Sequence, residues 1–160
     1  MRTIITILLA SYLLTACSHS YYVVRHAEKA DNSRDPALSQ PGEVRAQALK
    51  ETLKDAKIEH IYSTNFLRTK NTAEPLRAQR KLTTETYGPA PDSAFIQKLK
   101  ALKKNVLVVG HSNTVDDIVN GLTGQKTIPG DLQDSEYTNL YIVTFRGKKV
   151  SFERRTYGAQ

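Results

Sequence analysis

Hydrophobic and polar positions follow two different rhythms along the chain. Short β-branched and aromatic runs predict six strands, at residues 21–24, 60–63, 81–85, 105–110, 137–145 and 150–157. Apolar residues at helical spacing predict four helices, over residues 39–55, 66–79, 92–102 and 113–122. The first four strands therefore alternate with the four helices.

This alternation predicts an α/β fold. Strand and helix alternate four times before a terminal hairpin around Arg146-Gly147-Lys148. We expect a three-layer α/β/α sandwich whose central sheet is mainly parallel, with helices on both faces. Ligands of such folds bind beyond the carboxyl ends of the strands. That rule points to Arg25-His26, Ser63-Thr64 and Gly110-His111, which lie at the ends of three predicted strands.

The first residues have a different character. Arg2 precedes an apolar run over residues 4–14, which is typical of a secretory signal peptide. As a helix this run would rise about 16 Å, roughly half of the hydrocarbon core of a bilayer, so we do not expect a membrane span. Leu14-Thr15-Ala16-Cys17 resembles the lipobox of bacterial lipoproteins, whose Cys is diacylated and becomes the first residue.

We therefore expect a signal peptide over residues 1–16, a lipidated Cys17 and a short tether over residues 17–20, and one domain over residues 21–160. The alternative is an unmodified Cys17 within an apolar segment. By analogy with bacterial lipoproteins, Ser18 after the Cys is compatible with the outer membrane. The expected location is the cell envelope, facing the periplasm.

Composition narrows the classes of fold and partner. A single Cys excludes a disulfide framework and a cysteine zinc cluster. The formal charge of +7 suggests an anionic partner. Because the chain lacks a basic run and an RNA-binding aromatic signature, we expect no nucleic acid. A membrane surface and a small phosphorylated molecule both remain as partners.

Four short motifs occur in an order that is specific to one family. They are Arg25-His26-Ala27-Glu28, Leu38-Ser39-Gln40-Pro41-Gly42, the segment 62–69 with Ser63 and Arg68, and the segment 108–112 with Gly110-His111. In these motifs the chain resembles the histidine phosphatase superfamily, also called phosphoglycerate mutase-like. The resemblance covers residues 21 to about 124.

The resemblance implies roles for four residues. His26 would be the nucleophile, and Arg25, Arg68 and His111 would form the phosphate pocket. Chemistry supports these residue types, because a neutral imidazole can attack phosphorus and guanidinium forks match phosphate oxygens. We expect no metal or other cofactor, because these arginines would repel a cation that bound His26, His111 or Glu28.

The general acid is harder to assign. In the superfamily, one branch uses a Glu after the third strand and the other an Asp directly after the second His. Ser112 occupies the latter position here, so Glu85, near the end of the third predicted strand, is the candidate. An exposed structural charge is the alternative for Glu85. Asp92 and Asp116 are further candidates, although Asp92 is equally explained as a helix cap.

These features predict a metal-independent phosphomonoester hydrolase that forms a phosphohistidine on His26 and is exported and lipid-anchored. One alternative is an envelope lipoprotein that binds a phosphorylated ligand without turnover. Another is a phosphohistidine-protein phosphatase, although export separates the chain from cytoplasmic partners. The substrate and the oligomeric state stay open.

Overall fold

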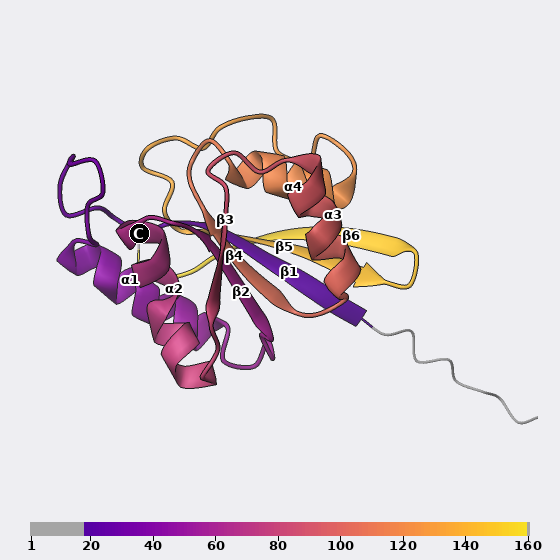
Figure 1. Ribbon diagram of the computed structural model, residues 1–160, viewed down its shortest axis with the longest axis horizontal. Helices are drawn as coiled ribbons and strands as arrows, with labels where there is room; N and C mark the ends of the chain where they lie inside the picture. The colour runs from indigo at the N-terminus through magenta and orange to yellow at the C-terminus, as the bar shows by residue number, and fades with distance from the viewer. Residues whose placement is uncertain (1–17, 160) are drawn as a thin grey trace, which may run out of the picture.

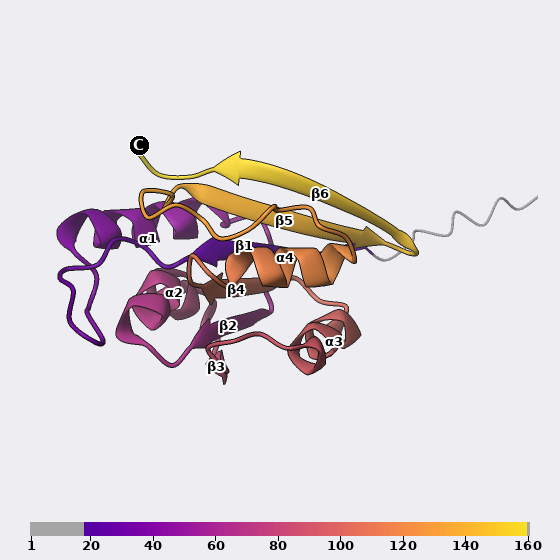
Figure 2. The same cartoon turned by 90° about the horizontal axis from the view of Figure 1, so that it is seen from above.

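A six-stranded mixed sheet organises the computed structural model, which describes residues 18–159 (Figure 1). The strands are β1 Ser18–Arg25, β2 His60–Thr64, β3 Thr84–Tyr87, β4 Val106–Gly110, β5 Asn139–Arg146 and β6 Lys149–Thr156. The helices are α1 Gln40–Thr52, α2 Leu67–Arg80, α3 Ser93–Leu102 and α4 Val115–Thr123. The strand order is β3-β2-β4-β1-β5-β6, which is visible from above in Figure 2.

Helices cover both faces of the sheet. Helices α1 and α2 bury Leu49 and Leu76 against one face, and α3 and α4 bury Leu99 and Ile118 against the other. Figure 1 shows the two helix pairs on opposite sides of the strands. The predicted three-layer α/β/α sandwich is confirmed.

The central strands run in parallel, and the carboxyl-terminal hairpin runs against them. Strand β4 pairs in parallel with β1 and β2, and β2 pairs in parallel with β3. Strand β5 is antiparallel to both β1 and β6. Since Arg25 lies beside Gly110 in register, the carboxyl ends of β1 and β4 meet at one edge of the sheet.

Several element boundaries differ from the predicted ones. Lys81 is not in a strand but ends α2 in the left-handed conformation, so β3 begins at Thr84. Strand β1 begins at Ser18, where the tether was expected, because Ser18 to Ser20 pair with β5. The expected signal peptide and Cys17 lie outside the described residues. Within residues 18–159, every helix is too short or too polar to cross a bilayer.

Helix α1 packs closely against the chain that follows β1. The side chain of Ser39 caps the helix by accepting a hydrogen bond from the Gly42 N–H. A Cβ atom on Gly42 would lie 2.3 Å from the carbonyl oxygen of Glu28. This contact explains the glycine of the second motif, because only a residue without Cβ allows so close an approach.

Candidate active site

The predicted site residues converge at the carboxyl edge of the sheet. Arg25 ends β1, His26 follows it, and His111 follows β4. Arg68 lies in the first turn of α2. All four line one hollow of about 360 Å³, together with Phe66, Asp134 and residues of the loop 29–36. The sequence thus located this group, although only the tertiary fold brings its members together.

His26 is buried and held in one orientation. His26 is 4% exposed, and its Nδ1 lies 2.8 Å from the carbonyl oxygen of Ala27. Because a carbonyl only accepts, Nδ1 carries the proton and the lone pair is on Nε2. Burial lowers the pKa of His26 to about 3. The contact with Ala27 raises this pKa, and the positive charge of nearby groups lowers it further. The imidazole is therefore neutral and has a free nucleophilic nitrogen.

His111 is oriented by a threonine that sequence reasoning missed. Its Nε2 lies 2.8 Å from Oγ1 of Thr64, and its Nδ1 lies 3.5 Å from Nη2 of Arg68. A guanidinium only donates, so Nδ1 accepts and Nε2–H donates to Thr64. Burial, followed by Arg68 and Arg25, lowers the pKa of His111 to about 4. Nδ1 can donate to phosphate only after the ring is protonated, which a bound anion favours.

Arg25 and Arg68 are each held by an aromatic ring. The Arg25 guanidinium lies 4.3 Å from the ring centroid of Tyr137, and that of Arg68 lies 4.3 Å from the centroid of Phe66. Arg25 also donates from Nη1 to the carbonyl oxygens of Gln133 and Asp134, at 2.8 and 3.0 Å. These contacts leave the Nε–H groups of both arginines buried without a hydrogen-bond partner.

Two buried, unpartnered N–H donors beside a polar hollow are costly unless a ligand satisfies them. An anion with several oxygens would accept from both guanidinium groups. The hollow is therefore suited to a phosphate group placed near His26.

The structure does not bring Glu85 to this hollow. Its carboxylate accepts from the Tyr62 hydroxyl at 2.9 Å and from Lys98 at 3.2 Å, and it contacts His60 at 3.4 Å. Partial burial alone would raise the pKa of Glu85, but these hydrogen bonds outweigh it and the net pKa is below the ordinary value. β-Strand pairing turns the side chain toward Lys98 of α3, where it forms an ion pair.

The other candidate carboxylates also lie elsewhere. Asp92 caps α3 by accepting from the Phe95 N–H at 2.8 Å. Asp116 is buried with an unpartnered Oδ1, and burial, followed by Asp117, raises its pKa. Neither residue lines the hollow.

Among the described residues that line the hollow, Asp134 is the one with a carboxylate. Its side chain is fully exposed, and Oδ1 lies 3.3 Å from Nη2 of Arg25. The sequence offered no motif for this residue, only its place in the long segment between α4 and β5. In residues 18–159, no three His, Cys, Asp or Glu side chains gather closely enough to hold a metal ion.

The sequence of the first half of the domain matches a known family. Residues 21–87, which include Arg25, His26 and Arg68, match the Histidine phosphatase superfamily (branch 1). This match supports a histidine-type phosphatase. The resemblance that the four motifs predicted is confirmed. No curated protein matches the chain significantly in sequence.

Solved structures share the histidine phosphatase fold. The structure of the protein histidine phosphatase SixA complexed with tungstate is similar at a TM-score of 0.69 and 21% identity, over 86% of this chain and 96% of that one. A phosphoglycerate mutase from Bacillus anthracis has a TM-score of 0.61 and 16% identity, over 88% and 94% of the two chains. At these identities the likeness concerns the fold.

A mycobacterial glucosyl-3-phosphoglycerate phosphatase is similar over 89% of this chain and all of its own, with a TM-score of 0.60 and 13% identity. The phosphatase domain therefore spans nearly the full length of the solved structures that it resembles.

Proposed function

We propose that this histidine phosphatase is a metal-independent phosphomonoester hydrolase that works through a phosphohistidine on His26. The observation that carries this proposal is a neutral, oriented His26 beside two buried arginines whose Nε–H groups lack partners. The arginines bind the phosphate oxygens and stabilise the charge that develops on them during transfer. No step of this reaction needs a metal ion to supply positive charge.

The reaction has two steps. In the first, Nε2 of His26 attacks phosphorus, the bond from phosphorus to the ester oxygen breaks, and the departing alkoxide takes a proton. In the second, water attacks the phosphohistidine, the N–P bond breaks, and inorganic phosphate leaves with His26 restored. Asp134 is the carboxylate placed to give the proton to the leaving group and to take one from the water.

His26→Ala tests the nucleophile. We expect hydrolysis of an aryl phosphate to fall at least about 10³-fold, while inorganic phosphate still binds, because Arg25 and Arg68 remain. Mass spectrometry of quenched wild-type enzyme should find an acid-labile phosphate on His26. Retained turnover in the variant would show that another group attacks phosphorus.

A wild-type protein that binds phosphate without any turnover would support the non-catalytic alternative, a phosphate-binding lipoprotein of the envelope.

A phosphohistidine-protein phosphatase is a second candidate, and the exposure of the Asp134 carboxylate in the hollow favours it. Asp134 is fully exposed, whereas general acids are usually held in buried surroundings. Imidazole departs from phosphorus more readily than an alkoxide and so depends less on an acid. The likeness to SixA supports the same substrate. A kcat/KM for a phosphohistidine peptide well above that for alkyl phosphates would decide for this candidate.

We further propose that the chain is exported and attached to a bacterial envelope membrane through lipid on Cys17. The signal-like segment 1–16 and the motif that ends at Cys17 support this. Mass spectrometry of the amino-terminal peptide from membranes should show a diacylated Cys17. Cys17→Ser should abolish the modification, and an unmodified wild-type Cys17 would refute lipid attachment.

A further inference from the structure

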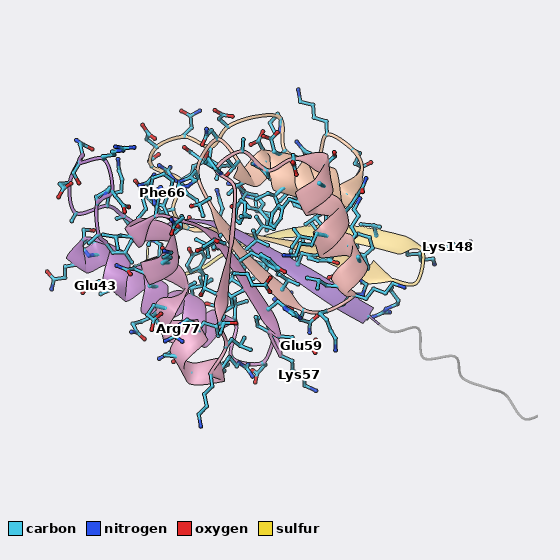
Figure 3. The ribbon with its side chains drawn as sticks, viewed as in Figure 1. Glu43, Lys57, Glu59, Phe66, Arg77 and Lys148 are labelled. Atoms are coloured by element: carbon cyan, nitrogen blue, oxygen red, sulfur yellow. The ribbon has the colours of Figure 1, made fainter. Side chains whose placement is uncertain are left out.

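Strand β1 separates the chain that leads to Cys17 from the hollow. It begins at Ser18 and ends at Arg25, so its ends lie about 23 Å apart at roughly 3.3 Å per residue. Ser18 pairs with Arg146, next to the turn between β5 and β6. In Figure 3, Lys148 of this turn and Phe66 of the hollow lie toward opposite sides of the molecule.

Four exposed cations surround the beginning of β1. Arg146, Lys148 and Lys149 belong to the hairpin of β5 and β6, and Lys103 ends α3. The pKa of His19 is lowered first by burial and then by the charge of Lys103, which places Lys103 near β1. The hydrogen bond from the Ser20 N–H to Asn105, at 2.8 Å, joins the loop after α3 to β1. We call these residues the basic tip: Lys103, Arg146, Lys148 and Lys149.

The charge of the basic tip is not neutralised by the protein. Within residues 18–159 no ion pair involves its four members. Two nearby carboxylates have other partners, since Glu59 pairs with Lys104 at 2.8 Å and Glu153 pairs with Arg155 at 2.6 Å. Val150, beside the tip, is 42% exposed. Unpaired cations beside an exposed apolar residue suit the interface of an anionic bilayer.

We infer that the basic tip lies on the anionic bilayer that holds Cys17, so that the hollow faces away from this bilayer and acts on water-soluble phosphate esters rather than on its headgroups. This inference rests on the proposed lipid attachment and hydrolase activity. It adds to that proposal the orientation of the domain on the bilayer. It also adds that the anchored enzyme does not act on the headgroups of that bilayer.

The pairing of the chain explains why the orientation is restricted. Cys17 directly precedes Ser18, the paired end of β1, so the domain cannot turn over on a long tether. Each cation near an anionic surface favours contact by about fivefold. The attraction falls off within about 10 Å at moderate salt, so it acts on the basic tip and not on the hollow.

The orientation can be measured on the full, lipidated chain in phosphatidylglycerol vesicles. Because lipid occupies Cys17, Lys148→Cys or Glu43→Cys supplies a single free thiol for a fluorescent probe. We expect quenchers in the bilayer to reach the probe at position 148 and not that at position 43, which lies on the opposite side in Figure 3. Equal quenching at both positions would overturn the inference.

Charge variants separate attraction from attachment. In the Lys148→Cys protein, Arg146→Glu or phosphatidylcholine vesicles should lower quenching severalfold, while Lys70→Glu, in the first turns of α2, should not. Unchanged quenching with Arg146→Glu would remove the basic tip as the cause. A chain that mass spectrometry finds unlipidated fails the proposed attachment instead, which is a separate result.

Substrate access is tested with one aryl phosphate in two forms. The water-soluble form should be hydrolysed by the vesicle-bound enzyme, whereas the form held in the same bilayer by an acyl chain should be hydrolysed at least tenfold more slowly. Detergent should abolish this difference. Equal rates in intact vesicles would overturn the inference, while hydrolysis of neither form, even in detergent, would refute the hydrolase itself.

Discussion

Arg45 of α1 holds Glu28, two residues after His26, through three short contacts. Its Nε lies 2.9 Å from both carboxylate oxygens of Glu28, and its Nη2 lies 2.6 Å from Oε1. The same guanidinium donates to the carbonyl oxygens of Tyr157 and Ala159 near the end of the chain. One largely buried side chain therefore joins the loop after His26, a helix and the carboxyl-terminal tail.

Arg45→Ala should lower the free energy of unfolding by about 3 kcal/mol, because it leaves the partly buried Glu28 carboxylate without its partner. We expect kcat to fall as well, since the residues after His26 lose their support. Urea denaturation and aryl phosphate turnover measure the two effects. Arg77→Ala, which removes the exposed ion pair with Glu74, is the matched control and should change stability little. Equal losses in the two variants would contradict a special role for Arg45.

Gly42→Ala should destabilise the fold by about 2 kcal/mol, because the new Cβ would meet the Glu28 carbonyl oxygen at 2.3 Å. Backbone atoms form this contact, so the clash cannot be relieved by turning a side chain. Gly130→Ala is the control, since a Cβ there has no atom within 4 Å. Thermal or urea unfolding compares them, and a Gly42→Ala protein as stable as the control would show that α1 shifts at no cost.

Acid should weaken the fold through the two site histidines. The unfolded imidazoles bind protons near pH 6.5, whereas the folded pKa values are about 3 for His26 and about 4 for His111. The unfolded state therefore binds more protons below pH 6.5. Each histidine should contribute a loss of about 2 kcal/mol in the free energy of unfolding between pH 6.5 and 5.

His26→Asn should flatten this dependence, because Asn does not titrate. Urea denaturation of both proteins at the two pH values measures the difference. Parallel pH profiles would mean that His26 titrates in the folded protein much as it does in the unfolded chain.

Two carboxylates should respond differently to neutralisation. Asp134→Asn should lower kcat on alkyl phosphates about 10²-fold and less on aryl phosphates, whose leaving groups need less protonation. Glu85→Gln should leave kcat unchanged, because Glu85 is bound to Tyr62 and Lys98 outside the hollow. Steady-state kinetics with both substrate classes tests the pair. A large loss in Glu85→Gln with an unaffected Asp134→Asn would restore the sequence-based assignment.

Local sequence patterns predicted most elements because short-range physics dominates them. The buried run of β4 and the helical spacing of α3 are visible in any listing of the chain. The boundary of β3 was wrong because Lys81 adopts a left-handed conformation that ends α2, which its residue type does not reveal. Likewise, nothing in the sequence near Thr64 indicated that its hydroxyl orients His111.

The sequence by itself determined the layered α/β architecture, because strands and helices alternate along it. It also indicated that Arg25, His26, Arg68 and His111 share one site, because the motifs place each of them at the end of a strand or the start of a helix. Only the tertiary structure decided which carboxylate reaches the hollow. The Glu85 side chain on β3 points toward Lys98 and forms an ion pair with it. The segment before β5 folds back so that Asp134 lines the hollow beside Arg25. Such choices depend on contacts between residues far apart in sequence, where local patterns carry no information.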